Sequence, residues 1–113
     1  MAAEDQTSSG KPPVQFVRLQ NIAWMNCKLC VDYGYDQNLQ TFKYTKEADE
    51  ILKDQTSMID LSQLDGIQPG DLVRPHVKAV QARSADPLKF SRNNQAATYQ
   101  FRGTLFDAWL DRM

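Results

Sequence analysis

The sequence predicts an all-β fold, a small antiparallel β-sandwich of about six to eight strands. Three observations lead to this prediction. Apolar and polar residues alternate with a period of two along several segments, as they do in strands buried on one face. Turn-forming residues separate these segments about every ten residues. The chain has 113 residues, which is enough for one domain with its own core.

The first residues differ in composition from the rest of the chain. Residues 1–13 contain Ser, Thr, Gly, Pro and charged residues, and their only large apolar residue is Met1. Such a segment cannot bury enough surface to offset the entropy of ordering it. We therefore expect a disordered N-terminal tail over 1–13 and a single β-sandwich domain over 14–113. Because the tail is acidic and lacks an apolar segment, it does not have the features of a signal peptide. We therefore expect a cytoplasmic protein.

The longest alternation runs from Val17 to Tyr35. One strand of this length would be unusual, so the pattern predicts two strands, roughly 14–20 and 23–33, with the alternation preserved between them. Turn-forming residues at 36–38 follow, and a weaker alternation over 39–45 predicts a third strand.

The segment 45–54 is the one candidate helix. Thr45 is a suitable N-cap, and Ala48, Ile51 and Leu52 would form a narrow apolar stripe. An extended conformation of residues 50–53 is the alternative.

The second half of the chain predicts further short strands. They cover residues 58–61, 72–82, 88–91 and 96–102, while 104–110 is either a last strand or a helical turn. Pro75 has no N–H to donate to a neighbouring strand, so its strand should lie at a sheet edge or contain a bulge.

Charge and hydropathy exclude several classes of function. The formal net charge is -1, and without Glu4, Asp5 and Lys11 of the predicted tail the domain is formally neutral. A general nucleic-acid-binding protein needs an excess of basic residues, so nucleic acid is not an expected partner. No apolar run reaches the roughly 20 residues of a transmembrane segment. A neutral domain associates with itself more readily than a charged one, so we expect a homo-oligomer.

Cys27 and Cys30 form a C-x-x-C pair inside a predicted strand. Residues three apart on a strand point to opposite faces, so these thiols should neither bridge nor hold one ion together. A zinc site would need two further ligands, and His76 is the only histidine. We therefore predict structural cysteines and no metal or cofactor.

The leading candidate for a ligand-binding site surrounds Trp24. Trp24 shares a strand face with Asn26, and a nearby loop adds Tyr35, Asp36 and Asn38. An exposed aromatic ring beside amide and carboxyl groups suits a glycan or another small polar ligand. Burial of Trp24 in the core or in a subunit interface is the alternative.

A second candidate site is the basic stripe of Arg74, His76 and Lys78, which suits an anion. The alternative is a solvated strand face opposite acidic residues on a neighbouring strand. No nucleophile motif accompanies His76.

The sequence therefore favours a non-enzymatic module for binding or self-assembly, with lectin-like carbohydrate binding as its possible activity. One alternative is a small hydrolase or isomerase that uses His76. Another is a membrane-active, toxin-like module, which would require an exposed apolar patch such as Leu105, Phe106, Trp109 and Leu110.

Overall fold

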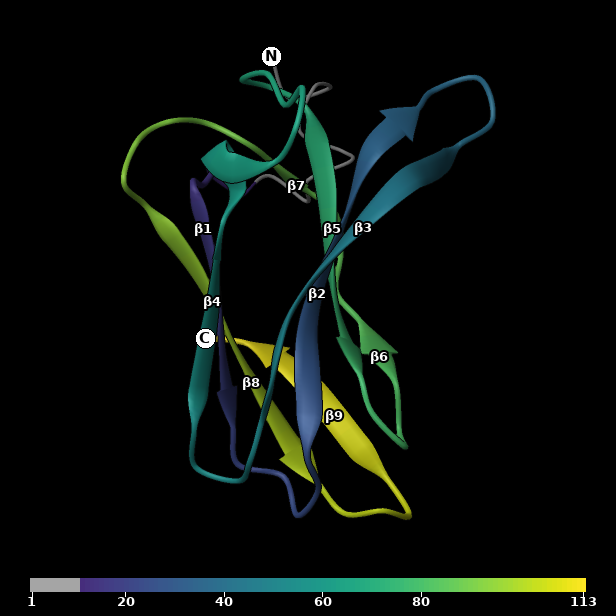
Figure 1. Ribbon diagram of the computed structural model, residues 1–113, viewed down its shortest axis with the longest axis vertical. Coiled ribbons are helices and arrows are strands. Elements are labelled where there is room, and N and C mark those ends of the chain that lie inside the picture. Colours follow the sequence, from purple (N-terminus) through teal and green to yellow (C-terminus); the bar gives the residue numbers. More distant parts are fainter. Residues whose placement is uncertain (1–10) are drawn as a thin grey trace.

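The computed structural model describes residues 11–113, which form two β-sheets packed together (Figure 1). The predicted all-β sandwich is confirmed. The molecule measures 40 × 25 × 25 Å along its principal axes. Residues 1–10 of the predicted tail lie outside the described residues. Val14 is buried and forms a parallel bridge with Phe90.

The two sheets contain all nine strands of the described residues. The four-stranded sheet has the order β4 (Thr56–Asp60), β1 (Phe16–Asn21), β8 (Ala96–Gly103) and β9 (Ala108–Arg112). The five-stranded sheet has the order β3 (Thr41–Ile51), β2 (Cys27–Asp36), β5 (Leu72–Lys78) and β6 (Arg83–Ser84), and β7 (Leu88–Lys89) also pairs with β5. Among the strands of residues 11–113, only β1 and β8 pair in parallel. One 3-10 turn, η2 (Leu61–Gln63), follows β4, and no helix among the described residues has the length and hydropathy to cross a bilayer.

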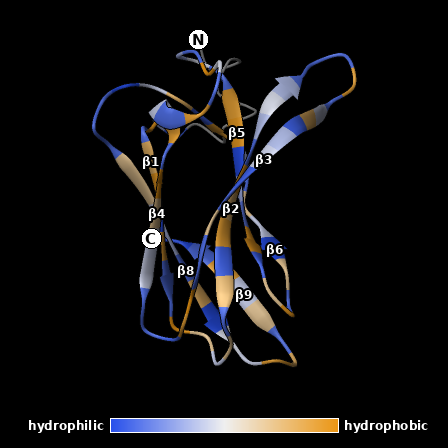
Figure 2. Ribbon diagram, viewed as in Figure 1, coloured by the Kyte–Doolittle hydropathy of each residue, from blue (hydrophilic) through white to orange (hydrophobic). Residues whose placement is uncertain are grey.

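The apolar residues of the alternating pattern lie in the core. Val17 and Leu19 of β1 and Leu29 and Val31 of β2 are fully or almost fully buried between the sheets. Apolar colouring recurs along the strands of both layers in Figure 2. The second strand begins at Cys27 rather than at residue 23, because residues 22–26 form the loop that crosses between the sheets.

The predicted helix over 45–54 is wrong. Residues 41–51 form β3, which pairs antiparallel with β2 over most of its length. Pairing with β2 satisfies the backbone and places Ile51 in the core, whereas a short helix would have buried only a narrow apolar stripe. The extended alternative is correct as far as Ile51.

Pro75 occupies a gap instead of a sheet edge. On one side β5 pairs with β2. On its other side β7 pairs with Leu72 and Val73, and β6 pairs with His76 and Val77. Pro75 lies between these two short partners, where a missing N–H is tolerated.

Candidate functional site

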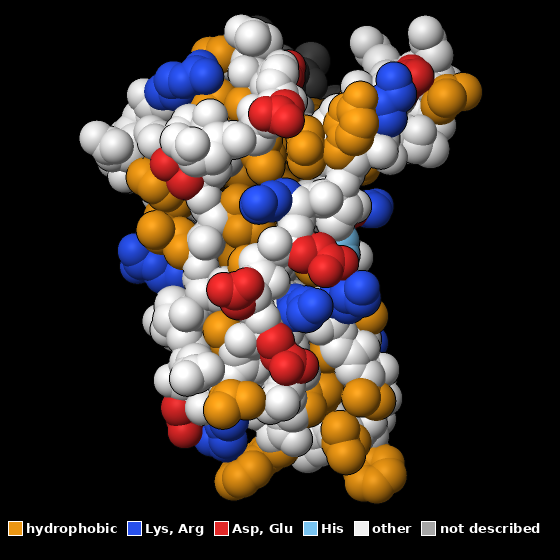
Figure 3. Space-filling view, in the orientation of Figure 1, with side chains coloured by type: hydrophobic (Ala, Val, Ile, Leu, Met, Phe, Trp, Pro, Cys, Tyr) orange, Lys and Arg blue, Asp and Glu red, His pale blue; other side chains and the backbone are white. Residues whose placement is uncertain are grey.

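Exposed apolar side chains gather at one end of the sandwich. Four loops meet there: 22–26 between β1 and β2, 52–55 between β3 and β4, 79–82 between β5 and β6, and 104–107 between β8 and β9. The apolar tip, as we define it, consists of Trp24, Leu52, Val80, Leu105 and Phe106. Phe106 is 93% exposed, Val80 74% and Trp24 72%. Figure 3 shows hydrophobic side chains along this lower end of the molecule.

The loop between β8 and β9 is a tight turn that carries two residues of the apolar tip. The Thr104 N–H donates to the Asp107 carbonyl at 2.7 Å and closes the turn. The Phe106 N–H donates to the Thr104 hydroxyl at 3.2 Å. These bonds satisfy two N–H groups of the turn, and Leu105 and Phe106 lie at its end with their side chains exposed.

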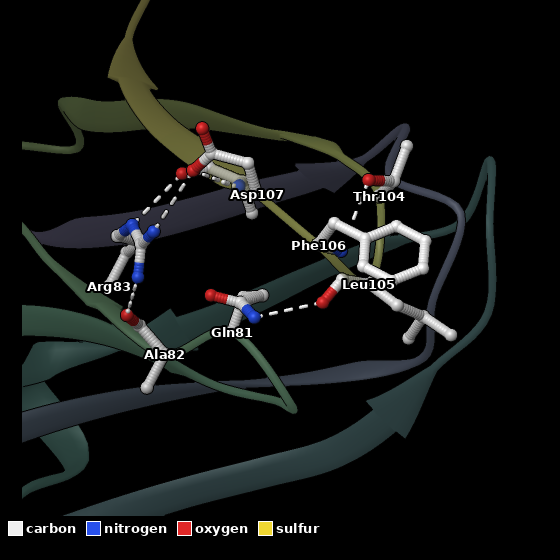
Figure 4. A network of polar contacts seen from close by, with 8 residues as sticks. Gln81, Ala82, Arg83, Thr104, Leu105, Phe106 and Asp107 are labelled. Carbon is white, nitrogen blue, oxygen red and sulfur yellow. Dashed lines mark hydrogen bonds and ion pairs between the residues drawn. The ribbon is translucent and has the colours of Figure 1, made fainter.

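Contacts with the neighbouring loop hold this turn in place (Figure 4). The Gln81 amide donates to the Leu105 carbonyl at 2.8 Å. Arg83 donates to the Ala108 carbonyl at 2.9 Å and lies 3.3 Å from the Asp107 carboxylate. The side chains of Leu105 and Phe106 point away from Arg83. The polar contacts thus fix the backbone and leave the apolar groups free.

A buried amide organises the loop that carries Trp24. Asn21 is fully buried; its amide donates to the Met25 carbonyl at 3.0 Å and accepts from the Ala23 N–H at 3.0 Å. The Trp24 N–H donates to the Gly103 carbonyl at 2.9 Å, which joins this loop to the end of β8. The Asn21 N–H also donates to the Gln55 carbonyl at 3.0 Å, so the four loops form one connected end.

Lys53 is the cation closest to the exposed tryptophan ring. Its ammonium nitrogen lies 4.6 Å from the ring centroid of Trp24 and 3.2 Å from the Asp54 carboxylate. A lysine in this position can keep its charge in water while its methylene groups cover an apolar surface.

The structure separates the predicted ligand-binding residues. Trp24 and Asn26 precede β2 at the apolar end, whereas Tyr35, Asp36 and Asn38 belong to the β2–β3 hairpin at the other end (Figure 1). The Asp36 carboxylate accepts from the Asn38 N–H at 2.9 Å, so it stabilises the hairpin turn. The five residues do not form one site, and glycan binding stays a prediction.

The basic stripe faces acidic residues. Asp32 is buried and lies 2.8 Å from the Arg74 guanidinium and 3.2 Å from Nδ1 of His76. The Thr45 hydroxyl donates to the same carboxylate at 2.7 Å. Lys78 pairs with a glutamate on β3 rather than with Asp32. This is the arrangement of the alternative interpretation, in which the stripe faces acidic residues on neighbouring strands.

The two cysteines are buried and unbridged, on opposite faces of β2. Cys27 packs in the core opposite Ile51, while Cys30 pairs with His76 on the outer face of the sheet. Burial, with smaller contributions from the charges of Glu50 and Cys30, raises the pKa of Cys27 to about 11. Burial also raises the pKa of Cys30. Both thiols remain protonated at neutral pH, which agrees with a structural role.

The expected apolar patch differs from the one observed. Leu105 and Phe106 are exposed at the tip, but Leu110 packs against the core. Trp109 lies on β9 with the Arg102 guanidinium 4.8 Å from its ring centroid. Sequence reasoning missed Leu52 and Val80, because Leu52 was assigned to a helix and Val80 to a strand. The sequence signal that could have identified both residues is a large apolar residue beside a turn.

Comparison with known proteins gives a likeness in fold. No family model matches the sequence, and no curated protein matches it. Among solved structures, the chain is similar to a protein described as a Gram-negative toxin, with 13% identity and a TM-score of 0.50 over 87% of this chain and 22% of that chain. At this identity the likeness concerns the fold alone.

Two further structures of similar shape are toxins or parts of toxins. The human-specific toxin intermedilysin is 8% identical, with a TM-score of 0.48 over 87% of this chain and 22% of that chain. The membrane-binding domain of pneumolysin is 13% identical, with a TM-score of 0.44 over 87% of this chain and 94% of that domain. The chain thus spans less than a quarter of the length of the intact toxins.

Proposed function

We propose that this domain binds to the surface of a lipid bilayer through its apolar tip. The observation that carries the proposal is the exposure of Phe106, at 93%, at the same end of the molecule as Trp24 and Val80. Contiguous apolar surface rimmed by polar residues is typical of protein or membrane interaction sites. Tryptophan favours the bilayer interface, where its ring is in an apolar setting and its N–H stays near water.

The hydrogen bonds that hold the loops of the apolar tip support the same proposal. The Asn21 and Gln81 side chains donate hydrogen bonds to the loops, and the Thr104 hydroxyl accepts one from Phe106. These bonds hold the loops in the conformation that exposes the apolar side chains. Binding through such a surface orders few additional groups, so less of the gain from burial is lost to entropy. Backbone hydrogen bonds also satisfy several groups of loops 22–26 and 104–107, which favours shallow insertion into the interface.

Flotation with phosphatidylcholine vesicles tests the proposal. The wild-type chain is expected to float with the vesicles. Burying a phenylalanine side chain contributes about 1.5–3 kcal/mol, so Phe106→Ser should weaken binding by roughly ten- to 100-fold. Leu105→Ser should act in the same direction.

Leu39→Ser is the matched control. Leu39 is 70% exposed, as a tip residue is, but it lies in the β2–β3 hairpin at the opposite end. This variant should bind like the wild type. A wild-type chain that does not float, or equal binding of all variants, would contradict the proposed function.

A further inference from the structure

A depression with charged walls lies directly behind the apolar tip. Its volume is about 670 Å³, and its lining includes Val80 and Leu105 of the tip together with Lys28, Lys78, Glu50 and Asn26. If the tip enters a bilayer, this depression is at the depth of the lipid headgroups. This inference therefore rests on the proposed function and deepens it.

The charged residues form a row across three strands. Lys28 of β2 pairs in register with Glu50 of β3 on one side and with Lys78 of β5 on the other. Neighbouring strands lie about 4.8 Å apart, and residues in register project to the same face of the sheet. A carboxylate and two ammonium groups thus stand side by side at the depression.

After the ion pairs around the depression are counted, one positive and one negative charge are not compensated. Glu47 is the carboxylate partner of both lysines, at 3.1 Å from Lys78 and 3.8 Å from Lys28. One carboxylate against two ammonium groups leaves a net positive charge. Within residues 11–113 no hydrogen bond or ion pair engages the Glu50 carboxylate, which leaves a negative charge beside it.

We propose that this depression binds the zwitterionic headgroup of a phospholipid. Lys28 and Lys78 hold the phosphate, the Asn26 amide donates a hydrogen bond to it, and Glu50 faces the ammonium group. The two charges of such a headgroup are joined by a two-carbon bridge, which matches the spacing of groups on neighbouring strands. The acyl chains then continue past Val80 and Leu105 into the bilayer.

A site of this kind distinguishes between classes of lipid. The headgroup of phosphatidylglycerol supplies the phosphate but no cation for Glu50, and the exposed carboxylate repels it. The wild-type chain should therefore bind neutral phosphatidylcholine vesicles more tightly than phosphatidylglycerol vesicles at physiological ionic strength. Simple attraction between lysines and anionic lipid predicts the opposite order.

Charge-neutralising variants of the full chain test the assignment. The double variant Lys28→Gln/Lys78→Gln should weaken binding to phosphatidylcholine vesicles by roughly tenfold, and Glu50→Gln should reduce the preference for phosphatidylcholine over phosphatidylglycerol by roughly fivefold. Lys46→Gln and Asp49→Asn are matched controls, because both residues are exposed on β3 outside the depression. These controls should leave affinity and preference unchanged.

Soluble probes separate a zwitterion from a bare anion. Glycerophosphocholine should shift the backbone amide resonances of Asn26, Lys28 and Glu50, while inorganic phosphate, which supplies no cation for Glu50, should shift them clearly less. Equal shifts with inorganic phosphate would identify a general anion site and overturn the inference. If the wild type floats with both vesicle types equally and the variants match their controls, the inference fails while the proposed function stands. If the wild type binds neither vesicle type, both fail.

Discussion

At the apolar end, a buried polar residue fixes the conformation of the loop that carries the exposed Trp24. Asn21 is a fully buried polar residue whose side chain bonds two backbone groups of the loop that carries Trp24. A buried amide with both of its functions satisfied fixes one loop conformation. The position of the exposed Trp24 ring therefore depends on Asn21, which is itself fully buried.

Cys27 makes a pH-dependent contribution to stability. Its pKa is raised from 9.0 to about 11 in the folded protein, chiefly by burial. The unfolded chain loses this proton first, so the contribution is fully present below about pH 9 and is lost as the pH rises toward 11. The free energy of unfolding should therefore fall by roughly 2–3 kcal/mol across this range from Cys27 alone. Tyr99 and Cys30, whose pKa values burial also raises, add to the decline.

Urea unfolding at a series of alkaline pH values measures this effect. Cys27→Ala should lower stability at neutral pH but flatten the alkaline decline. An unchanged decline in Cys27→Ala would show that the buried thiol does not titrate as described.

Among the elements, the β8–β9 hairpin depends on Gly103. This residue has a φ of +124°, and a Cβ atom added there would lie 2.6 Å from the Ala108 Cα. An alanine would strain the backbone and also displace the start of β9. Gly103→Ala should therefore destabilise the fold by about 1–3 kcal/mol and weaken vesicle binding by shifting Leu105 and Phe106.

Gly66→Ala is the control for this prediction. Gly66 also has a positive φ, of +74°, but a Cβ there would meet no atom within 4 Å. Gly66→Ala should lower the free energy of unfolding by only about 1 kcal/mol, the penalty of the left-handed conformation. It should leave vesicle binding unchanged. Equal effects in urea unfolding and flotation would show that the close approach at Gly103 is unimportant.

The elements also show what sequence alone can predict. The period-two pattern from Val17 to Val31 identifies the buried face of β1 and β2, because each inward side chain must be apolar whatever the sheet order. The pattern failed at 45–54, where pairing with β2 outweighs local helix propensity. Strand bounds near residues 22–26 were also missed, since alternation continues through the crossing loop.

The candidate site was harder to predict because it depends on sheet topology. Phe106 was available from the sequence as part of an apolar patch, but Val80 lies far from it in the chain. Contacts such as that of Gln81 with Leu105 bring the two loops together in the fold. The depression behind the tip depends on the register of β3, β2 and β5, which no local pattern contains.

At the scale of the whole molecule, the two ends of the sandwich differ in chemistry. One end collects exposed apolar side chains from four loops, and the other carries the β2–β3 hairpin, in whose turn Leu39 is the exposed apolar residue (Figure 1). An elongated molecule of 40 × 25 × 25 Å with one apolar end suits an upright orientation on a bilayer. The charged walls of the depression then face the headgroups rather than the acyl chains.

The fluorescence of the two tryptophans tests this orientation most directly. Trp109→Phe leaves only Trp24, at the tip, and Trp24→Phe leaves only Trp109, beneath Arg102 on the outer face of the four-stranded sheet. Each variant is mixed with phosphatidylcholine vesicles whose acyl chains carry bromine, which quenches tryptophan at close range. If the apolar tip enters the bilayer, Trp24 should be quenched strongly and shift to shorter emission wavelengths, while Trp109 should be quenched clearly less. No quenching of Trp24, or equal quenching of both tryptophans, would contradict this orientation.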